Sequence, residues 1–278
     1  RLVGSGNRLG LGAAASLDLP EGALEVSLAR ANVVDGAAFR KALQGACERA
    51  GALSGGPVAL VLPDPAVRVA LLPASELKAR RRAEVEQMIR FRLNKTVPFD
   101  VQQARVAWAG PEGGQMLVAA VFRPVLEGYE AVLRDLGFDP GLVEPASLAL
   151  VGTLERAETP GDRLLVNWDV GYVSLVLTRR GWPILIRTLV GALGPEAVLR
   201  EAANTVLYYR ERLGEQGLAG AALRSAFLPP EEAVTLLREP LGLEPEVVDP
   251  WALLGGGHRS AVAQAMAGAL ACLLRRAA

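Results

Sequence analysis

Asp169, Val170 and Gly171 form a segment whose residue types suit phosphate chemistry. The apolar run at 164–168 predicts a strand that ends at Asp169, and Gly171 permits a tight turn into a second strand. In such a hairpin the glycine lets backbone N–H groups approach a phosphate, while the aspartate positions a metal-bound water. Asp and Gly are also favoured in ordinary β-turns, and on these three residues alone the ordinary turn is the simpler interpretation.

The glycine-rich segment 4–12 is a weaker candidate for nucleotide binding. A GxGxxG loop would need a glycine at the position of Leu9, and a Walker A loop would need Lys followed by Ser or Thr. We therefore predict a hairpin turn in this segment.

The sequence contains few residues that could bind a metal ion or form a catalytic nucleophile with its base. The chain has one histidine, His258, and two cysteines, Cys47 and Cys272. These numbers exclude a multi-histidine metal centre, a CxxC zinc or redox site and a disulfide framework. A single histidine also gives no support for a Ser/His/Asp or Cys/His set. We expect no catalytic residues and no bound metal.

Charge and length narrow the class of protein further. The 278 residues include 30 Lys and Arg and 30 Asp and Glu, so the formal net charge is zero. A protein without a basic field is not expected to bind nucleic acid. The longest apolar run, 260–274, is shorter than the roughly 20 residues that a membrane-spanning helix needs, and we predict a buried C-terminal helix there.

One predicted helix, 75–94 with Ser75 as its N-cap, carries many cations. They are Lys78, Arg80, Arg81, Arg82, Arg90 and Arg92, with Lys95 just beyond. A contact for an acidic partner or for anionic lipid headgroups is one interpretation. A solvated face with Glu–Arg pairs is the simpler one.

Strand and helix patterns alternate along the chain. The first half predicts helices at 36–50, 75–94, 124–136 and 145–154, and strands at 57–63, 66–72, 104–108, 115–122 and near 142–143. A linker at 156–162 precedes three strands in a meander, at 164–168, 172–177 and 183–188. Helices at 195–213, 230–241 and 259–274 and strands at 223–228 and 246–248 complete the chain. This order predicts an α/β protein in two halves.

Four passages, in their order and spacing, resemble the PilM family, the actin-like cytoplasmic proteins of the type IV pilus machine. More distantly they resemble FtsA and the cytoplasmic part of GspL. The passages are a strand–turn–strand at 58–73, a charged helix with a VPF exit at 80–100, a strand–helix–strand–helix at 115–154, and the hairpin at 164–187. The last is similar to the phosphate-binding hairpin of actin-like ATPases, so the resemblance makes Asp169 and Gly171 the candidate nucleotide-binding residues.

The resemblance implies an actin-like α/β fold of two ribonuclease-H-like halves. The first half would span 1–155 and include an inserted α/β subdomain at about 57–138. The second half would span 162–258, and a C-terminal helix at 259–278 would pack back on the first half.

Two departures from the family bear on nucleotide binding. Members begin with a DxGxxxxK phosphate loop, which this sequence lacks, and they have a glycine turn where Pro229-Pro230 follows the strand at 223–228. Two prolines remove two N–H donors and fix φ, so they cannot replace that turn. We therefore predict degenerate or absent nucleotide binding, no cofactor and no enzymatic activity. The alternative is an ATPase that binds ATP and Mg²⁺ with a first phosphate loop upstream of Arg1.

The function implied by the resemblance is that of a cytoplasmic scaffold in a type IV pilus or secretion assembly platform. It would lie at the inner membrane by binding the cytoplasmic tail of a single-span, PilN-like partner. Other platform proteins, or further copies of the chain in an oligomer or ring, would be additional partners. The cytoplasmic domain of a GspL-like protein is the alternative.

The partner tail would bind in a groove beside the inserted subdomain, with Phe99, Arg92 and Met88 as contact residues. Val97-Pro98-Phe99 places an aromatic side chain on a rigid turn at a helix exit. Such a side chain either anchors a docked peptide or fills the subdomain core. The sequence leaves both interpretations open.

Overall fold

The computed structural model describes residues 2–5, 8–11, 13–52, 55–77, 81–154, 161–191, 193–214, 217–252 and 261–277. The chain divides into two units, Gly12–Pro145 and Ala146–Ala278, and the segment Leu2–Leu11 groups with the second. That segment is the predicted hairpin, in which β1 (Leu2–Ser5) pairs antiparallel with β2 (Arg8–Leu11). His258 and most of the predicted linker 156–162 lie outside the described residues.

The second unit is built on a five-stranded sheet with the strand order β10-β9-β8-β11-β12. The strands are β8 Asp162–Asp169, β9 Tyr172–Arg179, β10 Trp182–Val190, β11 Gly220–Ser225 and β12 Glu246–Val247. The first three form the predicted antiparallel meander, β11 runs parallel to β8, and β12 runs parallel to β11. Parallel pairing aligns the carboxyl ends of β8 and β11, so Asp169 and Ser225 lie at the same edge of the sheet.

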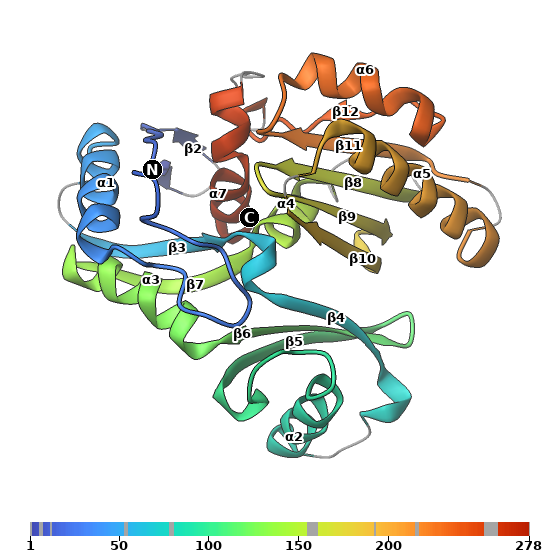
Figure 1. Ribbon diagram of the computed structural model, residues 1–278, viewed down its shortest axis with the longest axis horizontal. Coiled ribbons are helices and arrows are strands. Elements are labelled where there is room, and N and C mark those ends of the chain that lie inside the picture. The colour runs from blue at the N-terminus through green and yellow to red at the C-terminus, as the bar shows by residue number, and fades with distance from the viewer. Residues whose placement is uncertain are drawn as a thin grey trace. The chain divides into compact units, whose positions relative to one another are not determined.

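Two layers of helices cover the two faces of this sheet (Figure 1). They are α5 Pro195–Arg212 and α6 Pro230–Leu241 on one face, and α4 Ala146–Leu154 and α7 Ala261–Ala277 on the other. In the central strand β8, Leu164 and Trp168 pack in the core under α5 and α6, whereas Leu165 packs under α4 and α7. A strand buried on both faces is apolar almost throughout, which explains the continuous apolar run seen in the sequence.

Helix α4 belongs to the second unit, although the predicted division placed it in the first half, 1–155. Its residues Leu150 and Val151 are buried in the same cluster as Leu165 of β8 and Ala267 of α7. Helix α7, which was expected to pack on the first half, packs on α4 and β11 within the second unit. The boundary therefore falls after Pro145, because the apolar face of α4 is buried against this sheet and α7.

In the first unit, α1 (Gly36–Arg49) begins at a capped turn, in which the backbone N–H of Ala38 donates to Asp35 Oδ1 at 2.9 Å. Strands β3 (Gly56–Leu62) and β7 (Phe138–Pro145) pair in parallel, and α3 (Arg123–Asp135) leads into β7. Their shared core consists of the buried residues Leu62, Ala66, Val121, Val125 and Tyr129.

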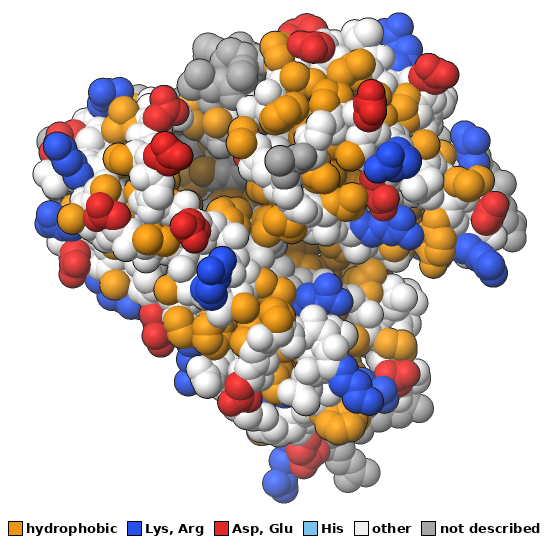
Figure 2. Space-filling view, viewed as in Figure 1, with side chains coloured by type: hydrophobic (Ala, Val, Ile, Leu, Met, Phe, Trp, Pro, Cys, Tyr) orange, Lys and Arg blue, Asp and Glu red, His pale blue; other side chains and the backbone are white. Residues whose placement is uncertain are grey.

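The inserted subdomain is a three-stranded antiparallel sheet with one helix packed on it. The strands, in the order β4-β6-β5, are β4 Arg68–Pro73, β6 Gln115–Phe122 and β5 Ala104–Glu112. Helix α2 (Arg82–Leu93) contributes the buried Ile89 and Leu93 to a core with Met116, Val118 and Ala120 of β6. The predicted subdomain at about 57–138 thus corresponds to residues 68–122, and its outer parts belong to the β3–β7 pair. Acidic and basic side chains are interspersed over the visible face of the protein (Figure 2), as its zero net charge leads one to expect.

Two predicted elements differ from the structure. The helix predicted at 75–94 begins only at Arg82, and Ser75 lies in a separate 3-10 turn, Ala74–Glu76. That turn ends because the next side chain, Leu77, is buried in the subdomain core. The strand predicted at 223–228 is β11, which ends at Ser225 because the Ser225 hydroxyl closes a turn with the backbone of Leu228.

Candidate functional site at the carboxyl end of strand β8

The hairpin predicted to bind phosphate is present between β8 and β9. Asp169 ends β8, and its Oδ1 accepts a hydrogen bond of 2.7 Å from the backbone N–H of Val170. Val170 is 71% exposed at the tip of the turn. Gly171 has φ +83°, a conformation that a side chain disfavours, although a Cβ atom there would meet open space. The glycine is therefore required by the turn geometry and not by a close neighbour within the protein.

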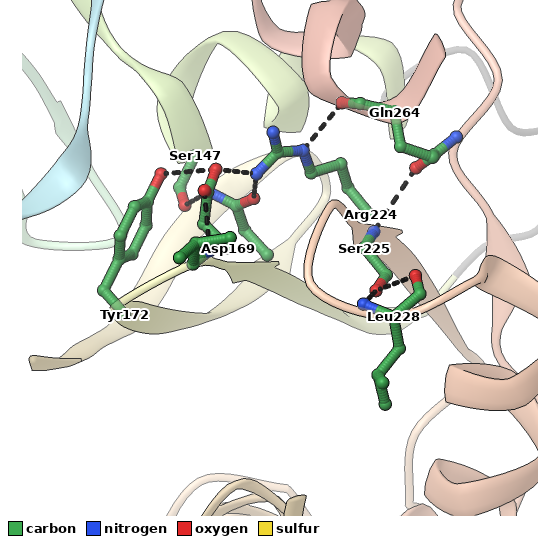
Figure 3. Close-up of polar contacts among 9 residues, drawn as sticks. Ser147, Asp169, Tyr172, Arg224, Ser225, Leu228 and Gln264 are labelled. Carbon is green, nitrogen blue, oxygen red and sulfur yellow. Dashed lines mark hydrogen bonds and ion pairs between the residues drawn. The ribbon is translucent and has the colours of Figure 1, made fainter. Parts of the chain in front are cut away.

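The carboxylate of Asp169 is ion-paired with Arg224 of β11 (Figure 3). The Tyr172 hydroxyl also donates to Asp169 Oδ2, at 3.4 Å. The Arg224 side chain is only 7% exposed, so its charge lies in a poorly solvated site next to the carboxylate. A buried guanidinium needs both an anionic partner and further acceptors, and the structure supplies them.

Arg224 is the centre of a buried polar network. Its Nη1 donates to Asn167 Oδ1 at 3.0 Å, and its Nε donates to the backbone oxygen of Gln264 at 2.8 Å. Asn167 Nδ2 in turn donates to Ser147 Oγ at 3.0 Å. Asn167, Ser147 and Gln264 are all buried. The network therefore links β8 and β11 of the sheet to α4 and α7, the two helices that cover one of its faces.

The Gln264 side chain extends this network to the ends of two strands. Its Nε2 donates to the backbone oxygen of Val248 at 2.9 Å, and its Oε1 accepts from the backbone N–H of Ser225 at 3.4 Å. Both the nitrogen and the oxygen of this buried side-chain amide therefore have hydrogen-bond partners. The interruption of the apolar run at Gln264 has a structural role at the site.

The loop after β11 is the segment in which the resemblance led us to expect a glycine turn, and it carries aromatic and proline residues instead. Phe227 stacks on Trp168 with ring centroids 5.6 Å apart and planes 16° apart. Pro229 and Pro230 then start α6, with Pro229 as its N-cap at φ −51° and no side-chain cap. Neither proline has a backbone N–H. This loop therefore presents an aromatic stack and two prolines at the end of the sheet.

Taken together, these contacts favour a structural role for the site residues. In a phosphate-binding hairpin the aspartate would position a metal-bound water, and here its carboxylate has an internal cation as partner. Among the described residues, no group of three or more His, Cys, Asp or Glu side chains is placed to hold a metal ion. Arg224 and Gln264, which organise the site, were not found from the sequence.

The predicted partner-binding residues lie in the inserted subdomain in different environments. Phe99 is half-buried and stacks on Phe122, with ring centroids 4.8 Å apart. Met88 is also half-buried against the subdomain core. Arg92 is exposed and forms an ion pair of 3.1 Å with Glu76. Phe91 of α2, which was not among the residues predicted from the sequence, is 74% exposed.

A second ionisable cluster lies at the opposite end of β8. The Tyr209 hydroxyl donates to Asp162 Oδ2 at 2.9 Å, and Arg179 Nη2 donates to the same oxygen at 2.7 Å. Burial and the bond to Asp162 raise the pKa of Tyr209 to about 12. Burial alone would raise the pKa of Asp162, but the hydrogen bonds from Arg179 and Tyr209 outweigh it and hold that pKa below its usual value. The cluster ties α5 to β8 and β9.

Comparison with known proteins shows which solved structures share this fold. No family model and no curated protein matches the sequence. Among solved structures, the PilM-PilN type IV pilus biogenesis complex matches with a TM-score of 0.77 and 22% identity, over 99% of this chain and 93% of that chain. The cytoplasmic domain of EpsL, an inner-membrane component of the type II secretion system of Vibrio cholerae, matches with a TM-score of 0.47 and 16% identity, over 70% and 69%. A Bacteroides thetaiotaomicron protein with an actin-like ATPase fold matches with a TM-score of 0.47 and 10% identity, over 81% and 84%.

The chain thus has the actin-like α/β fold predicted from its sequence. More particularly, it shares the fold of PilM along nearly its whole length, so the resemblance stated from the sequence is confirmed at the level of fold. None of the helices in the described ranges has the length and apolar character needed to cross a membrane.

Proposed function

We propose that this protein is a scaffold of an inner-membrane assembly platform for a type IV pilus or a related secretion system. It would bind the cytoplasmic tail of a single-span, PilN-like partner. The observation that carries this proposal is the fold, which matches PilM, a protein solved in complex with PilN, over 99% of the chain.

The site at the end of β8 supports recognition in place of nucleotide chemistry. The ion pair with Arg224 neutralises Asp169, the carboxylate that would otherwise attract a metal ion. For Asp169 to hold Mg²⁺, the metal would have to replace Arg224, a buried cation that also donates to Asn167 and to the backbone oxygen of Gln264. The stack of Phe227 on Trp168 and the two prolines, in the loop where the resemblance implies a glycine turn, also support this proposal. We propose that nucleotide binding is degenerate.

The inserted subdomain offers a surface for an extended tail. Strand β5 is an edge of its sheet, paired with β6 on one side. On the face away from α2, cross-strand register aligns Val69, Ala119 and Ala107 in one row and Leu71, Leu117 and Ala109 in the next. Ala107 and Ala109 are exposed, and the other four are half-buried. An extended peptide can add to such an edge by main-chain hydrogen bonds and place alternate side chains on the apolar face.

The experiment that tests this surface compares two arginine substitutions within the same subdomain. Ala107→Arg places a long charged side chain on the sheet face, while Gln87→Arg places the same charge on exposed α2. The probe is a synthetic peptide of the PilN tail from the same organism, titrated by calorimetry. We expect Ala107→Arg to weaken binding at least about tenfold, which is 1.4 kcal/mol, and Gln87→Arg to bind like the parent. Equal binding by both variants, with unchanged melting temperatures, would contradict docking on this face.

A further inference from the structure

Helix α2 presents an aromatic side chain directly to solvent. Its buried residues Ile89 and Leu93 pack into the subdomain core, and helical spacing places Phe91 on the opposite side. Phe91 is 74% exposed, and no other large hydrophobic side chain in the described part of the chain is exposed to that extent. Met88, one turn earlier, is half-buried beside it. Folding of the chain gives no reason for a phenylalanine at this position.

Basic residues flank Phe91 along the chain. Arg92 is exposed, and helical spacing places it on the same flank as Met88, while the exposed Arg81 and Lys95 lie just before and just after the helix. We call Phe91, Met88, Arg81, Arg92 and Lys95 the α2 patch.

Three acidic residues lie near the three patch cations, but one of them pairs with an arginine outside the patch. Glu86 forms an ion pair of 2.7 Å with the buried Arg90, and Glu76 pairs with Arg92 at 3.1 Å. Glu84 shares the outer face of the helix with Phe91. The patch as a whole therefore has a positive balance.

The placement of Arg81 is not explained by the stability of the helix. Arg81 is the N-cap residue of α2 and makes no side-chain capping bond. A cation at this end opposes the helix dipole, and Ser, Thr, Asp or Asn would cap the helix better. Arg90 meanwhile fixes the helix to the sheet, because its Nη2, paired with Glu86 of the same helix at 2.7 Å, also donates to the backbone oxygen of Ala104 at 3.2 Å. The patch is thus displayed on a helix that is fixed to its sheet.

We propose that the α2 patch binds the surface of an anionic lipid bilayer, with Phe91 inserted among the headgroups and the cations on lipid phosphates. Its chemistry fits such a surface, since an exposed aromatic ring can enter the headgroup region and nearby Lys and Arg are attracted to anionic lipid. An acidic protein fits less well, because protein interfaces centre on packed clusters of anchors and this helix offers one projecting ring. The contact goes beyond the proposed tail binding and acts on a different face of the same subdomain.

The test measures partition of the purified full chain, without any partner peptide, onto vesicles by flotation. Equimolar phosphatidylglycerol and phosphatidylcholine vesicles are compared with pure phosphatidylcholine. At about 0.02 M ionic strength we expect binding to the anionic vesicles alone, weakening as salt screens the charges. Phe91→Ala should lower the partition coefficient about fivefold, and the pair Arg81→Gln with Lys95→Gln about twenty-five-fold.

Matched controls lie on α5 of the second unit. Leu207→Ala removes an exposed apolar side chain, and the pair Arg200→Gln with Arg212→Gln removes two exposed charges. Both controls should float like the parent. The proposal is overturned if the parent fails to bind anionic vesicles, if it binds neutral vesicles equally, or if the control variants lose as much binding as the patch variants. Binding to poly-glutamate through Phe91 without binding to vesicles would assign the patch to an acidic protein and overturn the lipid contact. No tail peptide is present in these experiments. Their outcome therefore tests the lipid contact and leaves the proposed scaffold function to the peptide titrations.

Discussion

The guanidinium of Arg224 on β11 forms an ion pair with the carboxylate of Asp169 at the end of β8. Asp169 lies at the tip of the hairpin that the sequence resemblance made a candidate for phosphate binding. Its pairing converts a residue suited to metal and phosphate chemistry into part of a buried network that joins β8, β11, α4 and α7. We therefore expect the free energy of unfolding to depend on this ion pair.

Removing Arg224 should cost far more stability than removing the charge of Asp169. Arg224→Met leaves Asn167 and Asp169 without their buried donor, and we expect a loss of about 2–4 kcal/mol in the free energy of unfolding. Asp169→Asn keeps a hydrogen-bonding group on a carboxylate site that is partly exposed, so its cost should be nearer about 1 kcal/mol. Urea unfolding of both single variants and the double variant yields their coupling energy. A coupling below about 0.5 kcal/mol would show that the pair does not stabilise the fold.

Two phenylalanines of the inserted subdomain should behave in opposite ways. Phe99 stacks on Phe122 and is half-buried, so we expect Phe99→Ala to cost about 2–3 kcal/mol, somewhat less than a fully buried phenylalanine. Phe91→Ala removes an exposed ring and should change stability by less than about 0.5 kcal/mol. Thermal and urea unfolding distinguish the two. If Phe99→Ala melts like the parent, the ring does not support the core and its assignment as a partner contact gains ground.

Alkaline pH should weaken the fold through Tyr209. Burial and the bond to Asp162 raise the pKa of Tyr209 to about 12 in the folded protein, above the ordinary value of about 10. The folded state therefore favours the neutral hydroxyl, and its stabilising contribution is present below about pH 10 and is lost as the pH rises through about 12. Tyr209→Phe should be less stable than the parent by about 1–3 kcal/mol at neutral pH. The difference should shrink toward pH 12, as followed by urea unfolding, and a constant difference across this range would contradict the role of the hydroxyl.

The sequence predicted the central meander well, for a physical reason. The run 164–168 is apolar throughout because β8 is buried on both faces, and Asp169 and Gly171 are typical residues for the tight turn that follows. Local pattern and tertiary environment agree in this part of the chain. The same agreement made the actin-like fold recognisable from the order of its elements.

The contacts of Arg224 could not be predicted from local pattern. From the sequence alone, an arginine within a strand is expected to face solvent. The partners of Arg224, Asp169 and Gln264, are distant from it in sequence. They meet only because β11 pairs in parallel with β8 while α7 packs on β11. The hairpin that carries Asp169 and Gly171 was predicted correctly, but the ion-pair partner of Asp169 was not predicted.

The exposure of Phe91 could have been predicted from the sequence. The apolar positions Val85, Ile89 and Leu93 of α2 define its buried face, and Phe91 falls on the opposite side. The prediction instead chose Phe99, whose aromatic ring at a helix exit suits an anchor and a core residue equally well. Only packing, through its stack on Phe122, shows how far that ring is buried.

We propose that the chain recognises a partner tail without using nucleotide, and calorimetry of one peptide with and without ATP can show whether it does. The parent protein is titrated with the PilN-tail peptide, first alone and then with ATP and Mg²⁺ present. A scrambled peptide serves as the control. We predict saturable binding of the tail peptide with the same dissociation constant in both titrations, and no binding heat from ATP and Mg²⁺ alone. Binding of the tail only when ATP is present, or no binding of the tail at all, would contradict the account.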